Sequence, residues 1–98
     1  MTAPKPSVGR VVLVAVDPRT NNGADVAPAI ITRVWSDTMV NVRVLLDGSN
    51  ETPARTSVGL FADRAAVEAN AAEIVETWKR AGVELTHPPH SAYWPPRV

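Results

Sequence analysis

Two runs of apolar and β-branched residues, 28–35 and 39–46, lie on either side of a short polar break in the middle of the chain. In the second run, alternate positions are apolar and share one face of an extended chain: Val40, Val42, Val44 and Leu46. A period of two is typical of a strand that buries one face. Two such runs joined by a short turn predict an antiparallel β-hairpin from Pro28 to Gly48, which we expect to organise the fold.

The segments that flank this hairpin predict two further strands. Val8–Val16 is expected to be the first strand, and because its run from Val11 to Val16 barely alternates, we expect both of its faces to be covered. Asn21-Asn22-Gly23 is a turn signal within the segment 19–26, which predicts a long exposed loop. A second polar loop follows the hairpin and leads to a short fourth strand over Thr56–Phe61.

From Asp63 onward the period of the apolar positions changes from two to 3.6, which predicts a helix over Arg64–Ala81. Asp63 is a suitable N-cap, and Gly82 is suited to the left-handed residue that ends many helices. One stripe of this helix is apolar and is expected to face the core: Val67, Ala71, Ile74, Trp78 and Ala81.

Both ends of the chain are rich in proline and are expected to be extended. The C-terminal end also carries Tyr93 and Trp94, two large aromatics that a free tail would expose to water. We therefore expect Trp94 to dock on the apolar surface of the β-body near the hairpin, either in its own subunit or in a neighbouring one. If the tail is free instead, the aromatic pair becomes a candidate binding site.

These elements predict one domain of class α+β that is mainly β. We expect a small antiparallel SH3-like barrel or rolled sheet of four to five strands with one packed C-terminal helix. The expected organisation of residues 1–98 is an N-terminal arm over 1–7, a β-body over 8–61, a helix over 63–82 and a proline-rich tail over 86–98.

Composition narrows the classes of function. The formal net charge is zero, which argues against nucleic acid or an anionic membrane as the partner, because phosphate binding needs a positive field. The chain has no cysteine and therefore no disulfide or thiolate metal site. Its longest apolar run, Val11 to Val16, is too short to span a bilayer, and the N-terminus lacks the features of a signal peptide.

Two groups of residues resemble metal sites, but neither has a convincing ligand pattern. His87 and His90 lie near Glu84, but the prolines between the histidines favour an extended chain in which the imidazoles diverge. Oxygen ligands between Asp17 and Asp25 resemble a calcium loop, yet Arg19 stands where such a loop needs an acid. We expect no metal, no cofactor and no catalytic residue, since the groups needed for catalysis do not converge in the sequence.

Candidate binding residues are aromatic or cationic. Trp35 ends a predicted strand beside a turn, where it is expected to be half exposed. Arg33, Arg43 and Arg55 could form a cationic rim on the outer face of the sheet; the alternative, an ordinary solvated polar face, is the more frequent case. Tryptophan, tyrosine and arginine are enriched among residues that dominate binding energy. The candidate binding site predicted from the sequence therefore consists of Arg33, Trp35, Arg43, Tyr93 and Trp94.

Five blocks of the sequence, in this order, resemble a pattern shared by a known group of proteins. They are Lys5-Pro6-Ser7-Val8-Gly9-Arg10-Val11-Val12, Pro28-Ala29-Ile30-Ile31-Thr32-Arg33-Val34-Trp35, Val42-Arg43-Val44-Leu45-Leu46-Asp47-Gly48-Ser49-Asn50, Thr56-Ser57-Val58 and Trp94-Pro95-Pro96-Arg97-Val98. In these blocks the chain resembles small proteins of tailed bacteriophages, most of which are of unknown function. It departs from them by a helix inserted between Asp63 and Leu85, and by Ala92 at a position where they tend to carry a second tryptophan.

The resemblance implies a viral setting and no catalytic residues. We expect a non-catalytic phage-encoded binding module that acts in the host cytoplasm, either by binding a host protein or by sequestering a small defence ligand. The alternative is a structural virion component, such as a decoration or head–tail protein. A homo-oligomer is compatible with either expectation.

Overall fold

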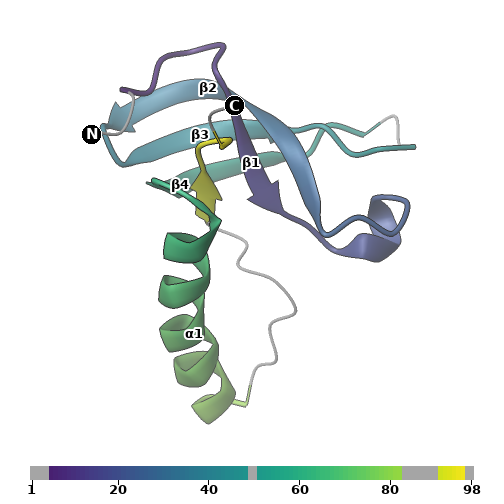
Figure 1. The fold of residues 1–98 in the computed structure, drawn as a ribbon, viewed down its shortest axis with the longest axis vertical. Coiled ribbons are helices and arrows are strands. Elements are labelled where there is room, and N and C mark those ends of the chain that lie inside the picture. The colour runs from purple at the N-terminus through teal and green to yellow at the C-terminus, as the bar shows by residue number, and fades with distance from the viewer. Residues whose placement is uncertain (1–4, 49–50, 83–90, 97–98) are drawn as a thin grey trace.

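The computed structural model describes residues 5–48, 51–82 and 91–96, with only the backbone described at positions 71, 73–75 and 77–78. Its elements in chain order are β1 (Val11–Ala15), the short 3₁₀ helix η1 (Pro18–Thr20), β2 (Val26–Ser36), β3 (Met39–Val44), β4 (Ala54–Phe61), α1 (Arg64–Arg80) and β5 (Ser91–Tyr93). The five strands form a closed barrel, and α1 extends away from it (Figure 1). The predicted fold class is confirmed, because a small closed β-barrel with one helix is consistent with an SH3-like barrel.

The predicted hairpin consists of β2 and β3, which pair antiparallel from Ala29 opposite Val44 to Ser36 opposite Met39. The alternation in the second run is confirmed, because Val40, Val42 and Val44 are fully buried and Leu46 packs against the same core. The fourth strand is also confirmed, with a start at Ala54 that is two residues earlier than predicted.

The first strand differs from the prediction in two ways. β1 begins at Val11 rather than Val8, because Gly9 has a φ of 93°, which interrupts the extended chain before the regular strand. The two faces of β1 are not equally covered, since Val12 and Val14 are fully buried whereas Val11 is 46% exposed. A closed barrel has one interior, and only the residues that point into it are fully covered.

The barrel is closed by a strand from the proline-rich tail, which the sequence did not predict. β5 lies between β1 and β4, antiparallel to β1 with Leu13 opposite Tyr93, and parallel to β4 with Leu60 opposite Ala92. The β-body predicted for residues 8–61 is therefore completed by residues 91–93. Beyond the strand, the Trp94 amide donates a hydrogen bond of 3.2 Å to the Phe61 carbonyl.

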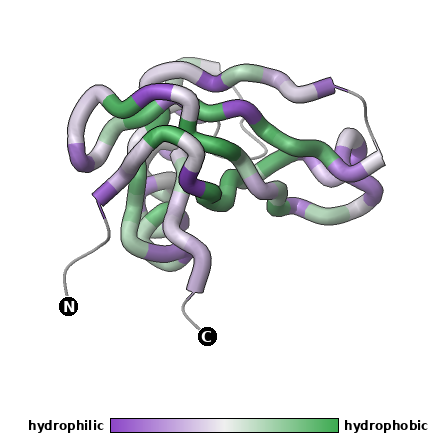
Figure 2. The backbone as a smooth tube through the Cα atoms, turned by 90° about the horizontal axis from the view of Figure 1, so that it is seen from above, coloured by the Kyte–Doolittle hydropathy of each residue, from purple (hydrophilic) through white to green (hydrophobic). Residues whose placement is uncertain are grey.

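The core fills the barrel and is built mainly of valine. Its members come from all five strands and the residues beside them: Val12, Val14, Val16, Ala27, Ala29, Ile31, Val40, Val42, Val44, Val58, Leu60, Ala92 and Trp94. In the view from above, hydrophobic positions follow the strands through the middle of the molecule (Figure 2). The predicted docking of Trp94 is confirmed, because its side chain is 6% exposed and belongs to this core in its own subunit.

The helix begins and ends as its sequence signals predict. The Asp63 side chain accepts a hydrogen bond of 2.9 Å from the Ala66 amide, and Gly82 has a φ of 83° just beyond the last turn. Val67 is 3% exposed, and α1 contacts β4 and β5. The Ala71, Ile74 and Trp78 side chains of the predicted stripe lie outside the described residues, and Ala81, which follows the last helical residue, is exposed.

The loop between β1 and β2 contains a buried residue that is hydrogen-bonded to its surroundings, unlike the exposed loop that was predicted. Asn21 is 2% exposed, and its side-chain amide donates hydrogen bonds to the carbonyls of Ala24 and Val26. Its side-chain oxygen accepts a bond of 2.6 Å from the Asp47 amide, which joins this loop to the end of the central hairpin. The prediction of an exposed loop is wrong at this position because a buried asparagine here satisfies three backbone groups.

Candidate functional site

The outer face of the hairpin carries a half-exposed tryptophan whose position is fixed. Trp35 is 52% exposed, as predicted, and it is the extra residue of a β-bulge between Val34 and Ser36. Bulges turn a side chain out of the regular alternation of a strand, which accounts for the outward position of this large apolar ring. Arg33 lies with its guanidinium 4.0 Å from the centre of the Trp35 ring, a cation–π contact.

Asn41 holds Trp35 in place and ties it to a third strand. The Trp35 Nε1–H donates a hydrogen bond of 2.8 Å to the Asn41 Oδ1, which also accepts a bond of 2.9 Å from the Ser57 amide. Ser57 has a φ of 53° and lies where the register between β3 and β4 shifts. The Asn41 side chain therefore satisfies a backbone N–H that the irregular ladder leaves unpaired, and it positions the indole at the same time.

Arg43 extends this face along β3, two residues beyond Asn41, and is exposed. Its Nη1 donates a hydrogen bond of 3.2 Å to the Thr52 carbonyl, which leaves its other donors available. None of the ion pairs among the described residues includes Arg33 or Arg43. We call the group formed by Arg33, Trp35, Asn41 and Arg43 the hairpin surface; it combines an aromatic ring with two cations.

Arg55 does not belong to this surface, which corrects the predicted three-arginine rim. Beyond the register shift between β3 and β4, Arg55 lies opposite Val42. Because Val42 is fully buried, Arg55 is on the inward side of β4. Its Nη1 donates a hydrogen bond of 2.9 Å across the end of the barrel to the Ala15 carbonyl. Burial of the charged guanidinium lowers the pKa of Arg55 from its ordinary value.

Tyr93 and Trp94 are placed in the barrel wall, away from solvent, with 6% of each residue exposed. The Arg10 guanidinium lies 5.1 Å from the centre of the Trp94 ring. The structure thus brings Arg33, Trp35 and Arg43 together on the outer face of the hairpin and separates them from the aromatic pair of the tail.

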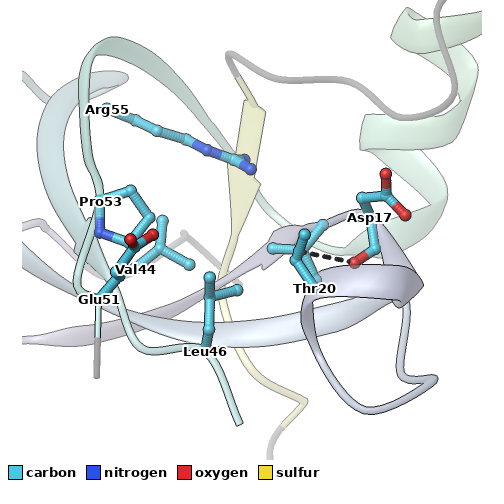
Figure 3. A pocket seen from close by; sticks show the side chains of 8 residues that line it. Asp17, Thr20, Val44, Leu46, Glu51, Pro53 and Arg55 are labelled. Carbon is cyan, nitrogen blue, oxygen red and sulfur yellow. Dashed lines mark hydrogen bonds between the residues drawn. The ribbon is translucent and has the colours of Figure 1, made fainter. Parts of the chain in front are cut away.

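A second candidate site is a cavity of about 540 Å³ at the end of the barrel opposite the hairpin turn (Figure 3). Its walls are apolar at Val16, Val44, Leu46 and Pro53, and polar or charged at Asp17, Thr20, Glu51 and Arg55. Figure 3 shows the Arg55 side chain extended from β4 across the upper side of this cavity. Sequence reasoning did not predict it, because its lining residues come from segments far apart in the chain.

The oxygen ligands considered as a calcium loop do not converge on a common centre. Asp17 binds Arg19 with a closest distance of 2.7 Å, and these hydrogen bonds raise the pKa of Arg19. Asp25 binds Arg64 at 2.9 Å at the start of α1. The part of the chain that the structure describes contains no group of three or more metal-ligating side chains. The histidine pair His87 and His90, with Glu84, lies outside the described residues.

Comparisons with protein-family models, with curated proteins and with solved structures found no match to this chain. In the described residues, no helix is both long enough and apolar enough to cross a membrane.

Two asparagines that organise these sites were missed from the sequence. Asn41 interrupts the alternating valines of β3, and Asn21 precedes an Asn-Gly turn signal. Asparagine is depleted in strands, so its presence within a strand is a signal that the side chain bonds to backbone or to another side chain. Such a signal does not identify the partner, because the partners Ser57 and Asp47 lie in other segments.

Proposed function

We propose that this chain is a non-catalytic binding module that engages a protein partner through the hairpin surface. The observation that carries the proposal is the fixed, half-exposed indole of Trp35, held by Asn41 on one edge and by Arg33 on its face. A large aromatic that is already held in place loses little entropy on binding, which makes it an effective anchor.

The positive charges on the hairpin surface indicate which class of partner it suits. Arg33 lies opposite Asn41 in β2, Arg43 lies two residues beyond Asn41 in β3, and neither arginine has an ion pair within the described residues. A complementary partner presents carboxylates around an apolar depression that receives the indole. The formal net charge of zero supports a directed local contact in preference to general attraction to polyanions.

The biological setting rests on the resemblance of the sequence blocks to small proteins of tailed bacteriophages. On this ground we place the module in the cytoplasm of an infected bacterium, bound to a host protein. The alternative, a structural component of the virion, predicts that the protein copurifies with mature particles, whereas the host-acting module is absent from them.

The experiment compares partner capture by charge variants of the folded protein. Three forms of the protein are immobilised and exposed to an extract of host bacteria: wild type, the double variant Arg33→Gln/Arg43→Gln and the control Arg80→Gln. The bacterial proteins that each form retains are then quantified. The control removes an arginine whose side chain is 80% exposed on α1, away from the hairpin.

We expect a host protein that wild type and the control retain equally and that the double variant loses by about tenfold or more, since each charged hydrogen bond contributes about 1.5–3 kcal/mol. Raising the salt concentration should release the same protein. Equal retention by all three variants would contradict the proposal.

A further inference from the structure

The cavity at the end of the barrel has the properties of a small-molecule site that is separate from the hairpin surface. Its volume of about 540 Å³ lies within the roughly 300–1,000 Å³ typical of ligand pockets. Val44 and Leu46 in its wall lie at the end of β3 and just beyond it, whereas the turn that bears Trp35 precedes β3. Arg43, the member of the hairpin surface nearest to the cavity, is exposed on the outer face of β3, whereas its neighbour Val44 is buried on the inner face, so the two sites lie on opposite faces of the strand.

Arg55 is the residue that gives this cavity a chemical preference. Its guanidinium is partly buried, and its one described hydrogen bond, to the Ala15 carbonyl, uses one of five N–H donors. No ion pair among the described residues includes Arg55. Among the described residues, no fully buried side-chain nitrogen lacks a hydrogen-bond partner, so any Arg55 donor without a partner in the protein keeps some contact with solvent, and Arg55 lines the cavity.

A partly buried cation is stabilised by an anion that shares its site. Burial lowers the pKa of Arg55, and desolvation is the cause. A carboxylate restores the lost solvation of the guanidinium through two parallel hydrogen bonds, the geometry that the arginine fork favours.

The other lining residues limit the kind of anion. Glu51 and Asp17, which is paired with Arg19, also line the cavity, so that each further negative charge on a ligand adds repulsion. Leu46 and Pro53 are the apolar lining residues that keep accessible surface, and they suit a hydrocarbon body.

We propose that the cavity binds a small molecule that joins one carboxylate to an apolar body, with the carboxylate on Arg55 and the body against Leu46 and Pro53. This inference does not rest on the proposed function of the hairpin surface, and the two can fail independently.

The test is a titration of the isotopically labelled protein followed by nuclear magnetic resonance, with hexanoate as the probe. Three comparison compounds carry an alkyl chain like that of hexanoate but differ in charge. Hexanol is neutral, hexylamine is positively charged, and hexyl phosphate carries one more negative charge than hexanoate. We expect saturable shifts at amides of the lining residues with hexanoate, weaker shifts with hexyl phosphate, and the weakest shifts with hexanol and hexylamine.

Two variants and one control identify the residues responsible. Arg55→Gln should weaken hexanoate binding by about tenfold or more, because a charged bidentate contact is lost. Glu51→Gln, at an exposed position, should strengthen it by about twofold, because a repulsive charge is removed. Arg80→Gln should leave it unchanged.

The Glu51→Gln result and the order of the four probes keep the test decisive if Arg55→Gln does not fold. Equal shifts from hexanoate and hexanol would overturn the proposal, as would shifts that do not saturate. Hexanoate binding that is insensitive to Arg55→Gln in a folded protein would also overturn it.

Discussion

Trp35 and Trp94 have the same side chain and opposite environments. Trp94 follows β5 and is 6% exposed within the core, whereas Trp35 occupies a bulge and is 52% exposed. Burial of an aromatic of this size stabilises a small barrel strongly, while exposure of one has no benefit for folding. The exposed indole is therefore the one that we assign to a partner.

Asn21 is the residue whose loss should show that the β1–β2 loop supports the fold. Asn21→Ala removes two donated hydrogen bonds and leaves the amide of Asp47 without its acceptor. We expect a loss of about 1–3 kcal/mol in the free energy of unfolding, because a buried group is left unsatisfied. Chemical denaturation measures this value.

The matched control is the neighbouring Asn22→Gly. Asn22 is exposed and has a φ of 50°, a conformation that glycine adopts readily. We expect this substitution to change the free energy of unfolding by less than about 0.5 kcal/mol. If the two variants lost similar amounts of free energy of unfolding, the side-chain hydrogen bonds of Asn21 would not be what stabilises this loop.

At the scale of elements, the strength of the local signal decided what could be predicted. The hairpin and α1 have long periodic patterns, and Asp63 and Gly82 mark both ends of the helix, so their positions followed from the sequence. β5 has three residues next to prolines, which is too short for any period to be recognised. Its place depends on two strands, β1 and β4, that are distant in sequence.

Removal of residues 93–98 should therefore abolish or greatly weaken the barrel. The deletion takes away Tyr93, the last residue of β5, and the buried Trp94, and it shortens the strand that pairs with β1 and β4 to Ser91 and Ala92. We expect the cooperative thermal transition to disappear or to move to a much lower temperature, as measured by circular dichroism.

A double variant, Pro95→Ala/Pro96→Ala, is the control for this deletion, since both prolines are exposed. It should melt close to wild type, because only the entropy of the unfolded tail changes. If the deletion leaves both the melting temperature and the mass in solution unchanged, Tyr93 and Trp94 do not contribute to closing the barrel.

At the scale of the whole molecule, the fold was easier to predict than the site. Alternating valines specify a small barrel whatever it binds, and the predicted β-body formed with one strand added from the tail. The hairpin surface depends on two irregularities, the bulge at Trp35 and the register shift at Ser57, which do not follow from periodicity. Arg55 was predicted to lie before the fourth strand and over the outer face of the sheet, whereas it belongs to β4 and pairs with the buried Val42 beyond the register shift.

The two ends of the barrel have different chemistry. Arg33, Trp35 and Arg43 present cations and an aromatic ring on the outer face of the hairpin, while the cavity at the end of the barrel opposite the hairpin turn combines apolar residues with Arg55. A barrel of this size has room for both sites because its core is filled by side chains that take part in neither, apart from Val16 and Val44.

The most direct test of this account is the capture of a host protein by Trp35→Ala, with the melting temperature measured on the same preparation. We expect the variant to melt close to wild type, because the indole is half exposed, and to lose the captured protein. Trp94→Ala is the counterpart, with an expected loss of about 3–5 kcal/mol in stability. A Trp35→Ala protein that is folded and retains the captured protein at the wild-type level would contradict the account.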